Sequence, residues 1–564
     1  MKRLLARPAI VAIAALLAFV LTAPSLAGGL AQDDWLQFLS VNPNPRLPVT
    51  QAAPWDLFVF ERGERIEQRR LMDEGLRPWW MVPGLRMAFF RPLSSLTHFV
   101  DYRLAPSLPA LAHLHSLIWF ALAVAAVARL YRRLMGPIAL AGGAALLYAV
   151  DDAHGLAVGW LANRNAIIAT FFGALCIHAH DRWRSDGWRP GALLAPMLFA
   201  VGLCAGEAIL GALAYLVAHV LFLDKRGRRG FVIAPYVLVV IVWRLIYQAL
   251  GYGAWGSGFY IDPGREPGAF LIALVTRMPT LLVGQLALPP SELLLAIPGA
   301  TRIALLALGV VFLIWIAVSL PRDPRTRFWL TGCVLAVIPM CATWPNDRLL
   351  FFPGIGAMAL VASLIVGKRR VLAGALIATH VVIAPLLLPV RSLSFRVLFG
   401  GIQARAAATL PDDGDVVVIN APMFTAPVMG MALRGLAGKK MPHRTLVLSA
   451  GMAALSVTRI DDRTIDLHPD GGFLTDPMSV ALRGPDFPMH VGDEVALAGV
   501  TATVLSVDAG RPLAARFHFD SPLQDGDRRW VMWRGSGFVP FALPRIGETI
   551  AVPALDPWQV TGAR

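Results

Sequence analysis

Acidic and basic side chains stand at the ends of long apolar segments in this sequence. Ionisable groups at such places are costly unless they are compensated, so each of them is a candidate functional group. Carboxylates and guanidiniums gathered at one face of a membrane would form a site for an anion and a proton. The candidates are Asp33, Asp34, Arg91, Asp151, Asp152, His154, Arg164, Glu207 and Arg348.

Asp151, Asp152 and His154 also have the chemistry of metal ligands. Carboxylate oxygens and imidazole nitrogens suit magnesium, manganese or zinc. Asp151 and His154 are three residues apart and would share one face of a helix. Since no further ligand cluster is identifiable in the sequence, a divalent metal stays open and no metal site is assigned.

The composition indicates a membrane protein. Of the 564 residues, 56% are hydrophobic and only 16% are charged, with a mean hydropathy of +0.59. Several segments are long and apolar enough to cross a bilayer as helices. The formal net charge of +14 is spread over short basic tufts between apolar runs. That arrangement is typical of the cytoplasmic loops of a bacterial inner-membrane protein and argues against nucleic acid as a partner.

The apolar segments of residues 1–395 predict about 11 membrane spans when the basic tufts are placed in the cytoplasm. The first segment, 8–31, runs outward and places the acidic pair Asp33-Asp34 on the periplasmic side. A polar outer loop, 33–107, follows there. Within this loop, Trp79-Trp80 is typical of an aromatic anchor at the membrane surface, and a wall on which a sugar stacks is the alternative.

Three segments leave a second interpretation open. Residues 1–31 could be a cleaved signal peptide instead of the first span. Residues 192–222 could form one long helix instead of a hairpin of two short spans. The stretch 268–298 contains Pro289-Pro290 and is expected partly in the membrane interface. A full crossing there would place the C-terminal region in the cytoplasm.

Residues 412–564 differ in composition and predict a separate, water-soluble, β-rich domain on the periplasmic side. The run TATVLSVDAGRPLAARFHFD has two alternating segments joined by DAG, which is the pattern of a β-hairpin. Residues 396–411 are expected to be a linker. The predicted fold class is therefore a polytopic α-helical membrane protein with a C-terminal β-rich domain.

Short motifs follow one another through residues 1–390: FFRPLSSLTHFVDYRL, AHLHSLIWF, VDDAHGLAVGWLANRNAIIATFFGAL, GEAIL and NDRLLFFPGIG. In this order they resemble the membrane half of the transmembrane and TPR-containing O-mannosyltransferase family, and more broadly the glycosyltransferase C superfamily. The superfamily's acidic pair falls on Asp33-Asp34. The other matching positions are Arg91, Pro92, Leu93, His113, His154, Ala157, Val158, Trp160, Arg164, Glu207, Arg348, Leu349, Pro353 and Gly356.

The sequence also departs from that family. Leu156 stands where the motif has Glu, Asp151-Asp152 where it has His-Pro, and Gly206 where it has Lys. No TPR repeat follows. The resemblance therefore does not imply mannose as the sugar.

The resemblance implies roles for the candidate residues. Asp33 or Asp34, which the sequence does not separate, would be the base that deprotonates the acceptor, because a partly desolvated carboxylate has a raised pKa. Arginines would hold the carrier phosphate and stabilise its charge as it leaves. The phosphate-binding candidates are Arg91, Arg164 and Arg348, and the supporting residues are Asp151, Asp152, His154 and Glu207.

The function that follows is transfer of a sugar from a polyprenyl-phosphate carrier to a glycan, lipid or protein acceptor on the periplasmic face of the bacterial inner membrane. The alternative is a non-enzymatic protein, either a transporter or flippase of lipid-linked material or a scaffold that binds the carrier. A transporter of this kind often has repeated halves and ionisable groups at mid-membrane depth. The sequence shows no two-fold repeat and places its acids at segment ends, which favours the enzyme.

Overall fold

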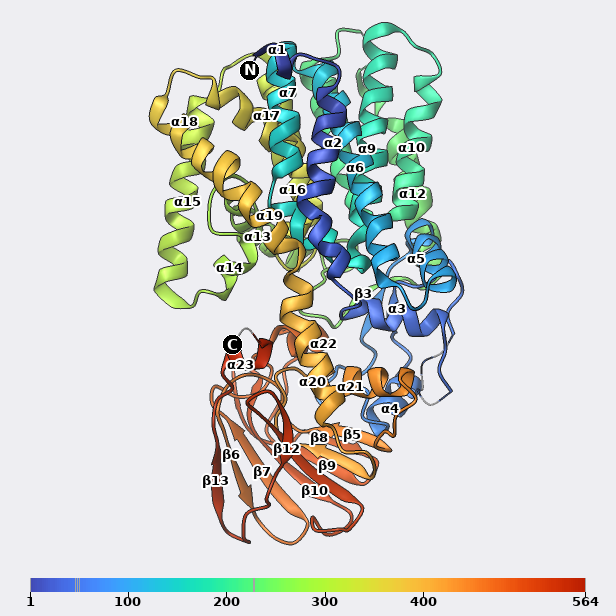
Figure 1. The fold of residues 1–564 in the computed structure, drawn as a ribbon, viewed down its shortest axis with the longest axis vertical. Helices are drawn as coiled ribbons and strands as arrows, with labels where there is room; N and C mark the ends of the chain where they lie inside the picture. The colour runs from blue at the N-terminus through green and yellow to red at the C-terminus, as the bar shows by residue number, and fades with distance from the viewer. Residues whose placement is uncertain (1, 46, 48, 50, 227–228, 563–564) are drawn as a thin grey trace.

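The computed structural model describes residues 2–45, 47, 49, 51–226 and 229–562. Residues 46, 48 and 50 of the predicted outer loop, and residues 227–228 of a basic tuft, lie outside the described residues. The molecule is elongated, with a bundle of helices at one end and a β-rich part at the other (Figure 1).

The bundle contains long apolar helices. Among the described residues, five are long and apolar enough to cross a membrane, or up to six if a bent pair counts as one span. The chain is therefore treated as a membrane protein, and the finer count of about 11 spans is not confirmed. The five long helices are Ile10–Ala27, Pro109–Leu134, Pro267–Leu286, Gly299–Ser319 and Arg370–Thr409, and the shorter apolar ones are Ile138–Val150, Gly191–Ala205, Glu207–Phe222, Ala234–Ala249 and Phe351–Ile365.

The labelled helices of the bundle include those within these segments and several others. They are α1 (Lys2–Leu5), α2 (Ile10–Thr22), α6 (Pro109–Leu134), α7 (Ile138–Val150), α8 (Ala153–Gly159), α9 (Arg164–Asp181), α10 (Gly191–Ala205), α11 (Leu210–Phe222), α12 (Ala234–Ala249), α13 (Pro267–Leu286), α14 (Ser291–Ala296), α15 (Gly299–Ser319), α16 (Pro324–Met340), α17 (Phe351–Ile365), α18 (Arg370–Ile377) and α19 (Ala384–Ser392).

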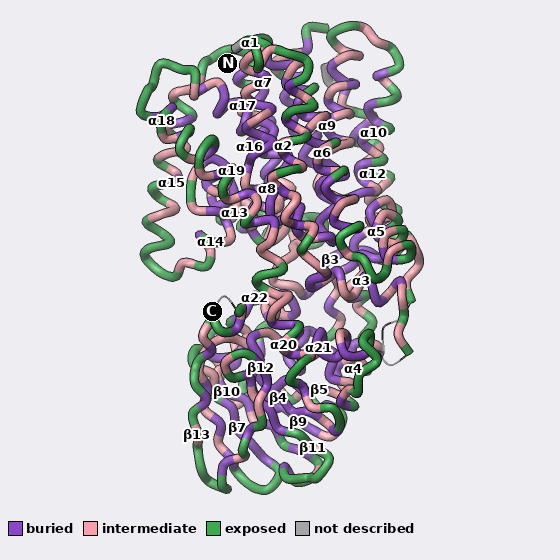
Figure 2. Tube along the Cα trace, viewed as in Figure 1, coloured by how far each residue is buried: buried purple, intermediate pink, exposed green. Residues whose placement is uncertain are grey.

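Helix α15 shows why this part belongs in lipid. It has a mean hydropathy of 2.4, yet only 11% of its apolar window is buried inside the protein. Ile303, Leu308 and Val311 are each more than 60% exposed, and the helix is coloured mostly as exposed or intermediate in Figure 2. An apolar surface of this extent is unfavourable in water and suits contact with hydrocarbon.

One helical segment of 40 residues, Arg370–Thr409, joins the bundle to the β-rich part. The segment contains two π-helical turns, Ala378–Ile383 and Arg396–Gly400, and ends with α20 (Gly401–Thr409). The stretch expected as a linker, 396–411, is therefore helical as far as Thr409. A helix transmits position between two parts more stiffly than a flexible linker does.

The strands of the C-terminal region form two sheets. The antiparallel sheet has the order β13-β6-β7-β10-β9-β8, and the second sheet has the order β12-β11-β4-β5, in which β4 pairs in parallel with β5 and β11. The strands are β4 (Asp415–Val418), β5 (Arg444–Val447), β6 (Leu455–Arg459), β7 (Thr464–Pro469), β8 (Glu494–Leu497), β9 (Val500–Asp508), β10 (Arg511–Phe519), β11 (Arg528–Arg534), β12 (Gly537–Pro540) and β13 (Thr549–Val552), and the helices are α21 (Thr425–Leu436), α22 (Pro477–Leu482) and α23 (Pro557–Thr561).

The predicted DAG hairpin is confirmed. Asp508 pairs with Arg511 across the turn. The two residues between them, Ala509 and Gly510, both have positive φ (48° and 78°). That conformation is typical of the two-residue turn that matches the twist of the flanking strands.

The first outer loop folds against the C-terminal sheets. It contains α3 (Asp33–Val41), β1 (Val59–Arg62), α4 (Arg65–Asp73), β2 (Arg86–Ala88) and α5 (Pro92–Leu104), and β1 and β2 form a small sheet with β3 (Gly253–Trp255).

Trp79 and Trp80 lie in the hydrophobic core that the outer loop shares with the C-terminal region, and each is 1% exposed. The Trp79 indole donates to the Leu448 carbonyl oxygen at 3.0 Å and packs on Phe473 and Phe517. The interpretation of this pair as a membrane-surface anchor is therefore wrong. Burial in a protein core removes the rings from water just as a membrane interface would.

Candidate functional site

A cavity of about 260 Å³ lies at the end of the bundle nearest the β-rich part. Its walls combine aromatic and aliphatic side chains with three arginines and two carboxylates. Three of the residues expected in one site, Arg91, Glu207 and Arg348, do line it together. The other lining residues include Phe89, Asn163, Asn165, Trp243, Arg244, Tyr247, Tyr260, Asp262, Met340, Leu349, Phe351 and Phe352.

Arg91 and Glu207 form an ion pair on the cavity wall. The Nε of Arg91, at the start of α5, donates to Glu207 Oε2 at 2.7 Å. The Arg91 guanidinium also lies 4.7 Å from the ring centre of Phe89. The second oxygen of Glu207 is buried and has no hydrogen-bond partner among the described residues. The pair therefore places one partly neutralised cation and one unused acceptor beside the cavity.

Arg348 is the cation with the fewest protein partners in this cavity. Its backbone amide donates to Asn346 Oδ1 at 2.9 Å, and its guanidinium lies 4.9 Å from the ring centre of Trp160. Trp160 in turn stacks on Phe395 at 4.4 Å. Within the described part of the chain, no carboxylate forms an ion pair with Arg348. Its charge is therefore available to an anionic ligand.

Asp34 is a buried structural carboxylate. It is 1% exposed, and its two oxygens accept hydrogen bonds from the backbone amides of Ala31 at 3.1 Å and Ala162 at 2.8 Å. The second bond ties the start of α3 to the break between α8 and α9, whose axes differ by 116°. Burial raises the pKa of Asp34 to about 8.

Asp33, by contrast, is partly exposed, and its carboxylate has no hydrogen bond or ion pair among the described residues. Burial raises its pKa to about 6, while the positive charges of Arg348 and Arg91 act in the opposite direction. Asp33 is not among the residues that line the cavity, but the two cavity arginines are close enough to act on its charge. The Asp33 carboxylate therefore lies within electrostatic range of two cavity cations.

Arg164 lies outside the cavity, although its neighbours Asn163 and Asn165 line it. The guanidinium is fully buried. It donates to the Ala112 carbonyl oxygen at 2.7 Å and to Ser116 Oγ at 2.9 Å, and it pairs with Asp101 at 2.5 Å. Because these partners occupy its donors, Arg164 fixes α9 against α5 and α6.

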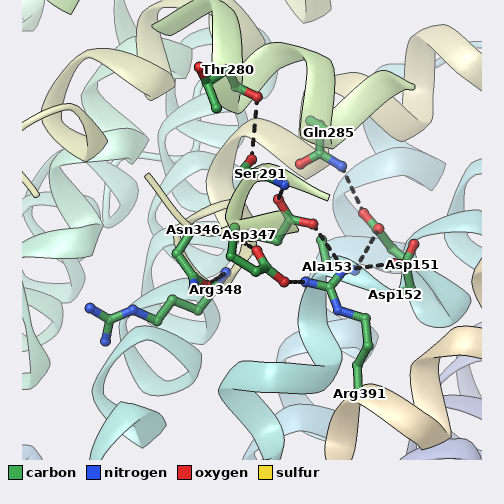
Figure 3. A network of polar contacts seen from close by, with 11 residues as sticks. Asp151, Asp152, Ala153, Thr280, Gln285, Ser291, Asn346, Asp347, Arg348 and Arg391 are labelled. Carbon is green, nitrogen blue, oxygen red and sulfur yellow. Dashed lines mark hydrogen bonds and ion pairs between the residues drawn. The ribbon is translucent and has the colours of Figure 1, made fainter. Parts of the chain in front are cut away.

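A second charged group, the Arg391 cluster, contains Arg391, Asp152, Glu292 and Asp347. Figure 3 labels Arg391, Asp152 and Asp347. The Arg391 guanidinium donates to Asp152 Oδ2 at 2.6 Å, to Asp347 Oδ2 at 2.9 Å and to Glu292. The three carboxylates come from three separate segments, namely the α7–α8 turn, α14 and the turn before α17. One cation therefore holds these segments together.

Asp347 and Arg348 are consecutive residues that point in different directions (Figure 3). Asp347 is 1% exposed and also accepts the Ser291 backbone amide at 2.9 Å. Since the backbone of Asp347 is held by the Arg391 cluster, the cluster also determines where the Arg348 side chain begins.

Asp151 and His154 do not form the metal site that their spacing allows. Asp151 accepts from Gln285 Nε2 at 2.9 Å and from the Ala153 amide at 3.2 Å. The His154 ring stacks on Phe351 at 4.5 Å. In the described ranges, no group of three or more His, Cys, Asp or Glu side chains is arranged to hold a metal ion.

Sequence reasoning missed Arg391, Glu292 and Arg244. Arg391 ends the apolar run of the last long helix, and Arg244 interrupts the apolar run of α12. The Arg244 side chain lines the cavity and donates to Asp262 at 2.8 Å. A lone charge in an apolar helix was the signal that could have identified both. Glu292 lies in the stretch 268–298, which the sequence left partly in the interface.

Comparison with known proteins finds no family model and no curated protein that matches this chain. Among solved structures, a chain of the archaeal oligosaccharyltransferase AglB from Archaeoglobus fulgidus, in complex with an inhibitory peptide and a dolichol-phosphate, is similar with 13% identity and a TM-score of 0.39. The match covers 78% of this chain and 64% of the AglB chain. A likeness at this level carries no argument about function, and the O-mannosyltransferase family is not confirmed.

Proposed function

We propose that this protein is a membrane glycosyltransferase that moves a sugar from a polyprenyl-phosphate carrier to an acceptor. The observation that carries the proposal is the Arg348 guanidinium, which lines a cavity with apolar and cationic walls and has no carboxylate partner among the described residues, with the Asp33 carboxylate within electrostatic range of it. A base and a phosphate-binding cation are the two groups that this transfer requires.

The cavity suits the carrier because a polyprenyl phosphate combines an apolar chain with an anionic head. Trp243 and Tyr247 on α12, and Phe351 and Phe352 on α17, provide apolar surface. Arg348 provides a fork of donors that matches the geometry of phosphate oxygens. Arg91 adds positive charge that Glu207 only partly neutralises.

The proposed reaction needs no reagent besides the sugar carrier and the acceptor. The acceptor hydroxyl gives its proton to Asp33, and its oxygen forms a bond to the anomeric carbon of the sugar. The bond between that carbon and the phosphate oxygen breaks, so the carrier phosphate leaves with an additional negative charge. Arg348 stabilises that charge, which develops only as the bond breaks.

The remaining candidates have positioning roles. Asp34 locks the segment that carries Asp33, Arg164 fixes the start of α9, and Asp152 helps to hold the turn that carries Arg348. Asp151 and His154 are buried beside that turn. None of these five side chains lines the cavity.

The acceptor side is assigned to the face where the C-terminal domain meets the bundle. The Val480 carbonyl of α22 accepts the Gly258 amide at 3.0 Å, and the Gly256 carbonyl accepts the Gly484 amide at 2.9 Å. These bonds fix the loop whose later residues, Tyr260 and Asp262, line the cavity. The domain therefore supports one wall of the site.

The membrane orientation follows from charge. Basic residues gather near the N-terminus and in the loop before α18, at the end of the bundle opposite the C-terminal domain (Figure 1). By the positive-inside rule that end faces the cytoplasm. The proposed site and the C-terminal domain then face the periplasm of a bacterial inner membrane.

The test is a transfer assay with the full-length protein in lipid vesicles, labelled polyprenyl-phosphate sugars and an extract of candidate acceptors. Labelled acceptor and released polyprenyl phosphate, formed in equal amounts, would support the enzyme. Carrier that binds without turnover with every sugar offered would favour a carrier-binding scaffold. Movement of the intact labelled carrier between leaflets without release of phosphate would favour a flippase.

A further inference from the structure

A second cavity, of about 620 Å³, lies at the end of the bundle opposite the proposed site. Its lining residues are Pro8, Val11, Arg129, Arg132, Arg133 and His178. Three of the six are arginines, none is acidic, and Pro8 and Val11 add an apolar wall. The three arginines lie on α6, at positions i, i+3 and i+4, so they share one face of that helix.

Arg129 and Arg132 are positive charges that the protein does not neutralise. Arg133 pairs with Asp181 and Asp186. Arg132 donates only to backbone carbonyl oxygens, such as that of Arg7 at 3.1 Å, and no carboxylate in the described part of the chain pairs with it or with Arg129. An anion that enters this cavity would therefore meet at least two unpaired guanidiniums.

The surface beside the cavity is suited to an acyl chain. Ile118 and Leu122 precede Arg129 by eleven and seven residues, so all three lie on one face of α6. The two aliphatic side chains are 46% and 43% exposed, and Arg129 is also exposed. The face therefore changes from apolar to cationic toward the helix end, as a lipid-facing helix does where it meets the head groups.

We propose that this cavity binds the phosphate of an anionic phospholipid, with the acyl chains along Ile118 and Leu122 of α6. Guanidiniums bind phosphate through paired, directional hydrogen bonds. Basic pockets between membrane helices on the cytoplasmic side favour such head groups. This site is separate from the proposed transfer site and does not depend on transfer activity, and its cytoplasmic position rests on the orientation proposed above.

The test measures lipid binding to the full-length protein in phosphatidylcholine nanodiscs titrated with phosphatidylglycerol. The double variant Arg129→Gln/Arg132→Gln should bind phosphatidylglycerol at least about 10-fold more weakly than the wild type, because it removes the two cavity guanidiniums that would donate charge-assisted hydrogen bonds to the phosphate. A matched control, Arg369→Gln/Arg370→Gln, removes the same charge from exposed positions at the same end of the bundle. It should bind within about 2-fold of the wild type.

A further variant and a competition experiment complete the test. Leu122→Glu leaves the arginines intact and places an acidic side chain where the acyl chains are proposed to lie. This variant should therefore also bind phosphatidylglycerol more weakly than the wild type. Inorganic phosphate at millimolar concentration should not displace the lipid, and displacement would identify a free-phosphate site instead. Wild-type binding of phosphatidylglycerol by both Arg129→Gln/Arg132→Gln and Leu122→Glu, or an equal loss in the Arg369→Gln/Arg370→Gln control, would overturn the proposal.

Discussion

The cavity and the Arg391 cluster are built from the same residue types but pair their charges differently. In the cluster, Arg391 holds Asp152, Glu292 and Asp347 within the protein. In the cavity, Arg348 has no carboxylate partner among the described residues. Arg91 has one carboxylate partner among them, Glu207. The two regions meet at the dipeptide Asp347-Arg348. The difference indicates that one region fixes geometry and the other leaves charge free for a ligand.

The largest effect on stability is expected from Arg391→Met. The substitution leaves three buried or partly buried carboxylates without their cation, and breaking such a pair costs about 3–5 kcal/mol. Unfolding in detergent, followed by intrinsic fluorescence, should occur at a much lower temperature than in the wild type. The control is Arg370→Gln, an exposed position at the start of the same long helix. Equal stability of the Met variant would show that the cluster does not fix geometry.

A smaller loss of stability is expected from Asp34→Asn. The amide has one acceptor oxygen, so one of the two backbone amides now bound by Asp34 loses its partner, at a cost of about 1–3 kcal/mol. Asp33→Asn should not lower stability, because the Asp33 carboxylate has no hydrogen bond to lose. Thermal unfolding of both variants in one detergent gives the comparison. If the two variants unfold at the same temperature, the assignment of separate roles fails.

Loss of the free cavity cation should weaken carrier binding without unfolding the protein. Arg348→Gln removes charge-assisted hydrogen bonds to phosphate, which contribute about 1.5–3 kcal/mol and correspond to about 10- to 100-fold in the Kd of polyprenyl phosphate. Arg103→Gln, an exposed residue of α5 without an ion pair in the described residues, is the matched control. Equal affinity of the two variants would place the phosphate elsewhere.

The pH dependence of transfer should show the raised pKa of Asp33. Only the deprotonated carboxylate accepts a proton, so a pKa of about 6 makes the transfer rate rise with pH up to about 7 and level off above that. Below pH 6 the rate should fall about 10-fold per pH unit. An unperturbed carboxyl, with a pKa of about 3.9, would keep the rate nearly constant down to about pH 5. A profile with that lower midpoint would contradict the raised pKa of Asp33.

The sequence predicted the membrane part and the β-rich part, because apolar length and alternation are local features. Of the residues expected in one pocket, Arg91, Glu207 and Arg348 line the cavity, whereas Asp33, Asp34 and Arg164 do not. The sequence did not separate these groups, because their meeting depends on contacts between distant segments. It could not separate Asp33 from Asp34. That choice depends on which acid reaches the backbone amides of Ala31 and Ala162, and the second of these contacts joins residues 128 positions apart.

Two other features depend on contacts between distant segments. Trp79-Trp80 has the same pattern whether it meets a membrane surface or a protein core, and only the C-terminal sheets decide between them. The Arg391 cluster joins residues that are up to 239 positions apart. No spacing rule within one helix or loop brings such residues together.

The most direct test of the central claim is the single-turnover rate of transfer by Asp33→Asn in protein that is already saturated with the carrier sugar. The account predicts a rate at least about 100-fold below the wild type, as for the loss of a general base, with unchanged affinity for the carrier and unchanged thermal unfolding. A wild-type rate from the folded variant would contradict the assignment of Asp33 as the base.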